Sequence, residues 1–262
     1  MRRKRSKRPK KGILYFLRAM IVLTGLGILF VAVILIKTNA EYNKGDSTYE
    51  EVRQIFTDIE AEGNNLDQGD ISSPNGFRGK DFQSLKEINE DIVAWIFAEG
   101  RTIDYPIVQG KDNSYYMRRM VNHEYNRLGT IFMDYRNQND FSDKNTVIYG
   151  HNIKDGSMFA LLTKYKDQDY YDNFPTMTLY TPKGDYTIEF FAGIIADGNY
   201  EFVRYKFADN EDFLDYVKSL EAESTFHGDI VIGADDRIVS LLTCSYEYNN
   251  ARYALFGRLK PH

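Results

Sequence analysis

The longest apolar stretch of the chain lies near its N-terminus. Residues 19–36, AMIVLTGLGILFVAVILI, contain no charged side chain and are apolar on every face of a helix. At about 1.5 Å per residue they span roughly 27 Å, close to the roughly 30 Å of a bilayer's hydrocarbon core. Nine Lys and Arg residues and no acid lie in residues 1–18. The pattern predicts a transmembrane anchor at residues 19–36 and, by the positive-inside rule, a cytoplasmic basic tail at residues 1–18.

A cleaved signal peptide is the alternative reading of this N-terminus. The apolar region of a signal peptide is usually about 7–15 residues long and ends at a small-x-small site. The run here is longer, and TNA at residues 38–40 is a poor match to such a site. The sequence therefore favours an uncleaved anchor, with residues 37–262 outside the cell membrane.

Helical periodicity continues after the apolar run. Val52, Ile55 and Phe56 recur at helical spacing behind the capping residue Ser47. The pattern indicates an extracellular helical stalk within residues 37–80. A second short helix is expected over FQSLKEINEDIVAW, residues 82–95, at the start of the folded domain.

Runs of β-branched and aromatic residues dominate the chain from about residue 101 onward. Gly, Pro, Asn and Asp separate the segments TIDYPIVQ, GTIFMDY, NTVIYGH, IVSLLTC and RYALFGRLK. Such runs are typical of strands joined by turns. Short helices are expected within residues 156–165 and 210–224. The sequence predicts one mainly β domain over residues 81–262, a closed barrel rather than a parallel α/β sheet.

Charge separates the basic tail from the rest of the chain. The tail holds nine of the 33 Lys and Arg residues, which leaves 24 against 38 Asp and Glu, a formal charge of −14. A domain that binds nucleic acid needs the opposite sign. Charge therefore excludes nucleic acid as a partner of the outer domain.

The chain has a single cysteine, Cys244, at the end of an apolar strand. Outside the cytoplasm a lone cysteine cannot form an intramolecular disulfide, so it is a link between chains or a free thiol. A free thiol has two readings, which are a buried packing residue and the nucleophile of an enzyme.

A thiol nucleophile needs an acid–base partner, and histidine is the usual one. His151 follows a predicted strand directly, at a loop position that presents a side chain rather than burying it. His123 and His227 lie in polar, turn-like segments, and we interpret them as structural. Arg252 opens the strand after Cys244, and in a hairpin its guanidinium would lie beside the thiol and suit an oxyanion. A solvated arginine at a strand edge is the alternative.

These motifs together resemble one known family, the class B sortases. The similar segments are TVIYGHN…GSMF, LLTCSYEYNNARYALFGRL and LKEINEDIVAWIFAEGRTIDYPIVQGKDNSYY. With the N-terminal anchor, the resemblance covers nearly the whole chain. It implies an eight-stranded β-barrel with short peripheral helices, preceded by an N-terminal helix and a single transmembrane helix. It also implies a membrane-anchored, extracellular cysteine transpeptidase of a Gram-positive bacterium.

The resemblance assigns roles to three residues. Cys244 would attack the Thr carbonyl of an Asn-Pro-x-Thr-like or Ser-Pro-x-Thr-like sorting signal near the C-terminus of a secreted protein, and form a thioester. His151 would be the general acid for the leaving amine and then the base for an incoming peptidoglycan amine. Arg252 would stabilise the oxyanion. No metal or organic cofactor is implied.

Five further residues match groove positions of the family or flank the nucleophile, and the resemblance makes them candidates for substrate binding. These are Tyr149, Asn113, Met117, Thr243 and Ser245. The Ser245 amide is also expected as a second oxyanion donor. Leu242 stands where many class B enzymes have Ser, which bears on substrate selectivity and not on the chemistry.

Two alternatives come from other classes of protein. L,D-transpeptidases also use a cysteine at the cell wall, but their Ser-His-Gly-Cys motif is absent and His151 lies 93 residues upstream of Cys244. A non-catalytic, membrane-anchored binding domain with a buried structural cysteine is the second. Labelling of the folded protein by an alkylating thiol reagent separates it from an enzyme, since a packed thiol resists such reagents.

Overall fold

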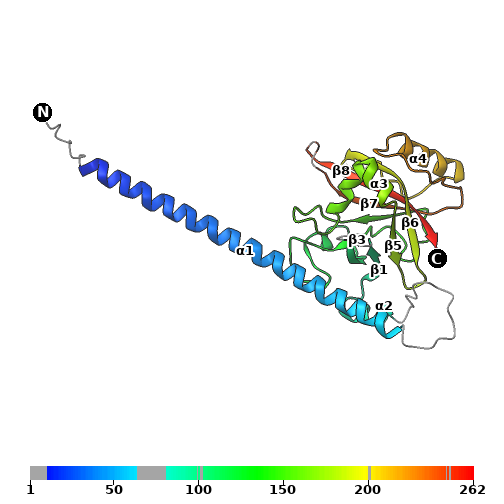
Figure 1. Ribbon diagram of the computed structural model, residues 1–262, viewed down its shortest axis with the longest axis horizontal. Coiled ribbons are helices and arrows are strands. Elements are labelled where there is room, and N and C mark those ends of the chain that lie inside the picture. Colours follow the sequence, from blue (N-terminus) through cyan, green and yellow to red (C-terminus); the bar gives the residue numbers. More distant parts are fainter. Residues whose placement is uncertain are drawn as a thin grey trace. The chain divides into compact units, whose positions relative to one another are not determined.

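The structure, a computed structural model, describes residues 11–63, 81–98, 100, 103–199, 202–245, 247 and 249–262. Most of the predicted basic tail and residues 64–80 of the predicted stalk lie outside this range. Within it, eight strands form a closed barrel, which confirms the expected fold (Figure 1). The strands are β1 (Ile92–Phe97), β2 (Asp104–Val108), β3 (Ile131–Met133), β4 (Asn145–Tyr149), β5 (Thr176–Tyr180), β6 (Tyr186–Asp197), β7 (Ile238–Cys244) and β8 (Ala251–Pro261).

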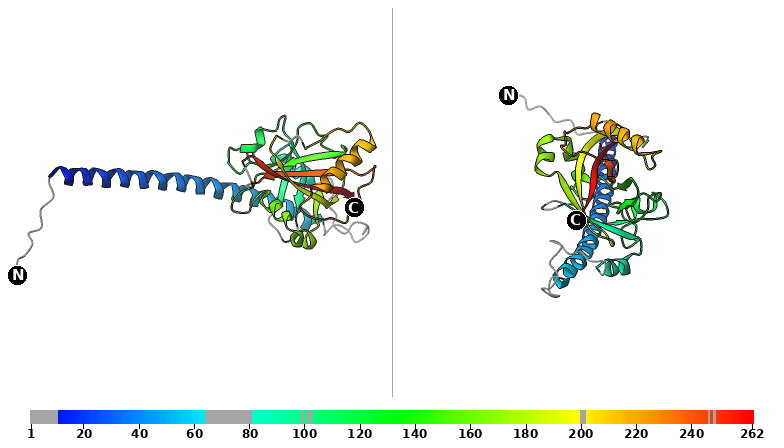
Figure 2. Two further views of the ribbon diagram at one scale, coloured as in Figure 1. Left: turned by 90° about the horizontal axis from the view of Figure 1, so that it is seen from above. Right: turned by 90° about the vertical axis from the view of Figure 1, so that its right-hand side faces the viewer.

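The order of the strands around the barrel is β1-β2-β3-β4-β7-β8-β6-β5. Neighbours pair antiparallel, except that β2 runs parallel to β3 and β4 runs parallel to β7. Figure 2 shows the long strand β8, in red, beside β6, in yellow, from two further directions. Because β4 and β7 are parallel, their C-terminal ends lie at the same end of the barrel. Strand β8 begins at that end too, because it is antiparallel to β7.

Helices precede the barrel and fill its connections. Within the described residues they are α1 (Lys11–Gly63), α2 (Asp81–Ile88), the 3-10 helices η1 (Tyr115–Arg118) and η2 (Ala160–Lys166), α3 (Gln168–Asn173) and α4 (Asn210–Ala222). Helix α4 has a clear N-terminal cap, because the Asp209 side chain accepts a hydrogen bond from the Asp212 N–H at 2.9 Å. One face of α4 is apolar and buried against the core, through Phe213, Val217 and Leu220. The helices η2 and α4 correspond to the two short helices expected from the sequence.

The helix expected over residues 82–95 ends earlier than predicted. Helix α2 ends at Ile88, and Trp95 lies fully buried in strand β1. Trp95 pairs with Pro106 of β2 on one side and with Tyr180 of β5 on the other. Strand pairing on both sides therefore outweighs the local helical periodicity.

The compact unit that contains the barrel runs over Gly45–His262. It includes the second part of α1, whose Tyr49 and Phe56 are buried. The Phe56 ring stacks on Trp95, with ring centroids 4.0 Å apart and an interplanar angle of 12°. The compact unit therefore begins earlier than the boundary at residue 81 that we expected from the sequence, because this part of the helix covers the barrel core.

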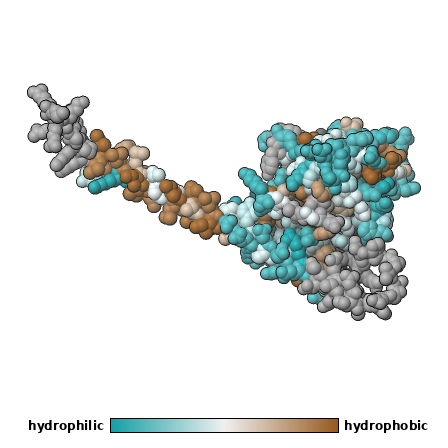
Figure 3. Space-filling model, viewed as in Figure 1, coloured by the Kyte–Doolittle hydropathy of each residue, from teal (hydrophilic) through white to brown (hydrophobic). Residues whose placement is uncertain are grey.

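The other unit, Met1–Lys44, contains the apolar part of α1. This helix holds an 18-residue window with a mean hydropathy of 2.9, and none of that window is buried. Figure 3 shows these residues as a brown, apolar surface. By length and composition, the segment is a candidate for crossing a membrane.

Candidate active site

The three residues predicted for catalysis lie at one end of the barrel. Just after β4, the Gly150 N–H donates a hydrogen bond to the Leu242 carbonyl oxygen of β7 at 3.0 Å, and His151 follows directly. Cys244 ends β7 and pairs across the hairpin with Arg252 of β8. Strand register thus brings together the segments that carry the three side chains. All three line one cleft of about 380 Å³.

The His151 side chain is held by η1. Its Nε2 lies 2.6 Å from the Met117 carbonyl oxygen. Because a carbonyl oxygen only accepts hydrogen bonds, Nε2 carries a hydrogen, and Nδ1 is the ring nitrogen that can exchange a proton. The backbone is fixed as well, since the Phe159 N–H donates to the His151 carbonyl oxygen at 2.8 Å. A Cβ atom added to Gly150 would lie 2.6 Å from atoms of the Phe159 ring, so the chain before the histidine needs a glycine.

Gly129 packs against the same histidine. Its φ angle is +62°, in the left-handed region that favours glycine. A Cβ atom there would lie 2.7 Å from the Tyr116 carbonyl oxygen and 3.1 Å from His151 Cδ2. The Gly129 carbonyl oxygen accepts a hydrogen bond from the Tyr49 hydroxyl of α1 at 2.5 Å. The position of His151 therefore depends on close backbone packing between η1 and the segment before β3.

Cys244 is partly exposed and lines the cleft, which distinguishes it from a thiol packed in the core. Its carbonyl oxygen accepts a hydrogen bond from Asn152 Nδ2 at 2.8 Å, which ties the loop after β4 to the end of β7. Arg252 is half-buried, and its Nη1 donates to the Ala251 carbonyl oxygen at 3.0 Å. These contacts fix the backbone on both strands of the hairpin. We did not single out Asn152 from the sequence, although it follows the histidine directly.

Four of the five residues predicted to bind substrate line the same cleft. They are Asn113, Met117, Tyr149 and Thr243. Phe132 and Arg136 also line it, and we did not predict them. Phe132 pairs with Tyr149 across β3 and β4, so its place on the cleft wall follows from a barrel register that the sequence alone does not reveal.

Ser245, the fifth predicted substrate residue, lies elsewhere. It is 5% exposed and is not among the described residues that line the cleft. Its N–H donates to the Ala251 carbonyl oxygen at 2.9 Å, and its hydroxyl accepts from Lys166 Nζ at 2.7 Å. The amide is thus used by the β7–β8 hairpin, which contradicts its expected part as a second oxyanion donor.

A small ionic cluster fixes the turn after β7. Glu247 accepts hydrogen bonds from the Lys166 ammonium and the Ser245 hydroxyl. Burial would raise the pKa of Glu247, but these two bonds outweigh burial and hold the pKa at about 2. At neutral pH the ionised carboxylate therefore anchors the segment between Cys244 and Arg252.

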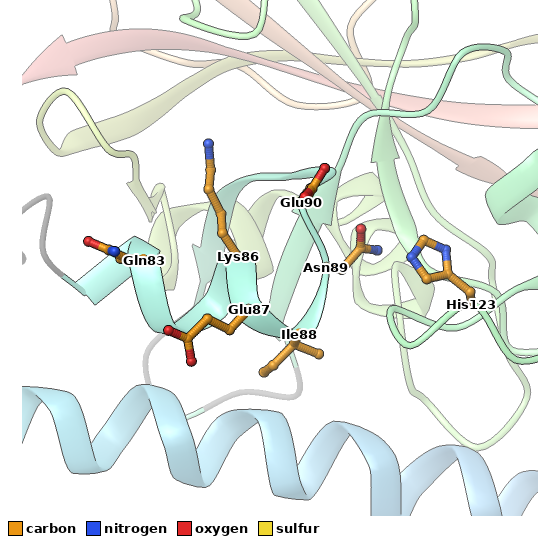
Figure 4. Close-up of a pocket in the computed structure, with 7 residues that line it drawn as sticks. All are labelled: Gln83, Lys86, Glu87, Ile88, Asn89, Glu90 and His123. Carbon is orange, nitrogen blue, oxygen red and sulfur yellow. The ribbon is translucent and has the colours of Figure 1, made fainter.

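A larger hollow, of about 770 Å³, lies along α2 and contains none of the predicted catalytic residues. Figure 4 shows Lys86 and Glu87 pointing to different sides of this helix, while His123 comes from a separate loop and lies near Asn89. The His123 Nδ1 lies 3.3 Å from the Tyr115 hydroxyl, a structural contact of the kind expected for this histidine. The charged groups do not converge, and the chemistry of the molecule belongs to the smaller cleft.

No family model matches the chain. It is similar to the sortase B of Listeria monocytogenes, with 39% identity over 187 residues, which make up 71% of this chain and 76% of that protein. It is also similar to the sortase B of Staphylococcus aureus, with 29% identity over 233 residues, or 87% of this chain and 91% of that protein.

Solved structures show the same relationship. A substrate complex of S. aureus sortase B matches with a TM-score of 0.75 at 27% identity and covers 84% of this chain and 98% of that chain. The sortase B of Clostridium perfringens matches with a TM-score of 0.65 at 35% identity and covers 68% of this chain and 98% of that chain. Sequence identity and barrel agree, and the chain belongs to the class B sortases, a family of cysteine transpeptidases.

Proposed function

We propose that the chain cleaves a C-terminal sorting signal of secreted proteins and transfers the new acyl end to an amine of peptidoglycan. The observation that carries the proposal is the meeting of Cys244, His151 and Arg252 in one cleft. The signal would be an Asn-Pro-x-Thr-like or Ser-Pro-x-Thr-like peptide, and the reaction would pass through a thioester on the cysteine.

In the first step, the Cys244 thiolate attacks the carbonyl carbon of the signal's Thr, and the C–N bond to the next residue breaks. Protonated His151 gives its Nδ1 proton to the leaving amine, while Nε2 keeps its contact with the Met117 carbonyl oxygen. The guanidinium of Arg252 stabilises the negative charge on the carbonyl oxygen in the transition state. The thioester and a free amine-bearing tail are the products.

In the second step, an amine attacks the thioester carbon, and the sulfur leaves as a thiolate. His151 Nδ1 takes the proton of the attacking amine, which restores the starting state. The staphylococcal relative has been solved in complex with a substrate and, separately, with triglycine. These complexes support a peptide donor and an amine acceptor for this chain as well.

The test is transfer by the full-length enzyme in detergent. Synthetic peptides with Asn-Pro-x-Thr and Ser-Pro-x-Thr order, and scrambled versions as controls, are incubated with triglycine or a peptidoglycan stem peptide. Mass spectrometry is expected to show cleavage after Thr and a new amide bond to the added amine. Absence of cleavage of every signal peptide by folded enzyme would reject the proposal.

We also propose that residues 19–36 anchor the enzyme with its catalytic domain outside the cell. Nine cations precede the apolar run, and such a cluster favours a cytoplasmic N-terminus. Protease added to intact protoplasts is therefore expected to remove a C-terminal epitope tag and to spare an N-terminal one. A lysate in which both tags are digested is the control. Protection of the C-terminal tag in intact protoplasts would reverse the topology.

A further inference from the structure

A buried carboxylate lies behind one wall of the cleft. Asp134 follows β3 directly and is 0% exposed. Its Oδ1 accepts hydrogen bonds from the Arg136 backbone N–H at 2.9 Å and from Arg136 Nε at 2.8 Å. Its Oδ2 accepts from Arg136 Nη2 at 2.8 Å. The guanidinium thus binds both oxygens of the carboxylate, a geometry in which a buried charge is compensated.

Three further donors from other parts of the chain reach the same Oδ2 atom. Asn113 Nδ2 lies 2.6 Å away, and the hydroxyls of Tyr149 and Tyr205 each lie 3.0 Å away. Asn113 precedes η1, Tyr149 ends β4, and Tyr205 belongs to the connection between β6 and α4. One carboxylate therefore joins three segments to the one that follows β3.

The joined residues form the cleft wall. Asn113, Arg136 and Tyr149 line the cleft that contains the thiol. Tyr205 supports them, because its hydroxyl lies 2.9 Å from that of Tyr149 and accepts from Arg136 Nη2 at 2.6 Å. The Arg136 guanidinium also lies over the Tyr205 ring, 4.0 Å from its centroid. The wall is thus built on a polar network with Asp134 at its centre.

The network requires an ionised carboxylate. Burial would raise the pKa of Asp134, but the hydrogen bonds from Arg136, Asn113 and Tyr149 outweigh burial and hold the pKa at about 2. An asparagine at this position could not replace the carboxylate. Its amide group carries two N–H donors, and donors already point at both oxygen positions, so either orientation of the amide opposes them.

We propose that Asp134 is a positioning residue that holds the substrate-binding wall of the cleft in place. It acts through Asn113, Arg136 and Tyr149, and its effect is on capture of the sorting peptide and not on bond making. The inference rests on the proposed function, since it assumes that a peptide occupies this cleft. The thiol is held separately, through the bond between Asn152 and the Cys244 carbonyl.

The test is the steady-state kinetics of full-length Asp134→Asn on the sorting peptide. We expect KM to rise at least about tenfold, the factor that corresponds to losing one hydrogen bond to a charged group. The kcat value and the rate of Cys244 alkylation by iodoacetamide should stay close to wild type, because neither depends on the wall. A merely structural residue would instead lower the thermal midpoint and reduce the active fraction without changing KM.

Asp140→Asn is the matched control. Asp140 also has a pKa lowered to about 2, mainly by bonds from Ser142 and Lys183, but it does not line the cleft. Its loss should leave KM unchanged. Tyr205→Phe is a gentler second variant, which removes one hydroxyl from the network and keeps the ring under Arg136. It should raise KM in the wild-type background and add little to Asp134→Asn, since the two share one network.

The outcomes separate the inference from the proposed function. If wild type transfers no peptide, the proposed function fails, and the inference fails with it. If wild type transfers peptide but Asp134→Asn keeps the wild-type KM, only the inference is overturned. A lowered kcat with slowed alkylation would also overturn it, since Asp134 would then act on the chemistry. Should Asp134→Asn not fold, an unchanged KM in Tyr205→Phe overturns the inference.

Discussion

Cys244→Ala is expected to abolish both peptide cleavage and acyl transfer. Without the sulfur no thioester forms, and neither His151 nor Arg252 can supply a replacement nucleophile. The fold should survive, because the substitution removes one small group from a partly exposed position at the end of β7. The measurements are peptide turnover by mass spectrometry and a thermal melt of the same preparation.

The matched observation is covalent capture. Wild-type enzyme should gain the mass of the acyl fragment on the peptide that contains Cys244, whereas the alanine variant should gain none. Turnover near the wild-type rate in a well-folded Cys244→Ala would remove the thiol from the mechanism and return it to a structural role.

Loss of the Arg252 guanidinium is expected to produce the second largest effect. Arg252 pairs with Cys244 in the hairpin and lines the cleft, so its charge lies where an oxyanion would develop. Removing one oxyanion donor typically costs about 10²- to 10³-fold in turnover. Arg252→Lys keeps the charge but loses the planar array of donors, so it should recover only a small part of that loss. The measurement is kcat/KM for Arg252→Ala and Arg252→Lys.

Strand β8 supplies a control arginine. Arg258 donates to Glu189 through Nε at 2.9 Å and lies away from the cleft-lining residues. Arg258→Ala should lower thermal stability and leave kcat/KM unchanged. If both Arg252 variants melt like wild type and lose less than about tenfold, or about 1.4 kcal/mol, Arg252 does not bind the oxyanion. The catalytic set would then reduce to Cys244 and His151.

The catalytic trio could be proposed from the sequence because each residue lies at the end of a strand with a clear pattern. His151 follows a β-branched run, Cys244 ends another, and Arg252 begins the next. A side chain just beyond a strand is presented at the barrel's end whatever the loops do. The helix predicted through Trp95 was wrong for the converse reason, since pairing with two neighbouring strands is a long-range property.

Residues that act through distant contacts were not predictable in the same way. Asn152 and Cys244 are 92 positions apart, yet one hydrogen bond joins them. Asp134 lies in an ordinary strand-to-turn segment, and its neighbours Asn113 and Tyr205 are 21 and 71 positions away. Ser245 was misjudged because its direction depends on whether its amide continues the hairpin, which spacing does not reveal. In each case the missing information is which donors meet which acceptors in three dimensions.

The hydrogen bond between Tyr49 and the Gly129 carbonyl oxygen affects how a recombinant enzyme should be trimmed. Gly129 packs against the catalytic histidine, and Phe56 of the same helix covers Trp95. A truncated enzyme that starts at residue 81 loses both supports, whereas one that starts at Gly45 keeps them. The shorter version would report a weakened active site as if it were the enzyme's own, and the first residue of the recombinant chain would become a hidden variable in every rate measured with it.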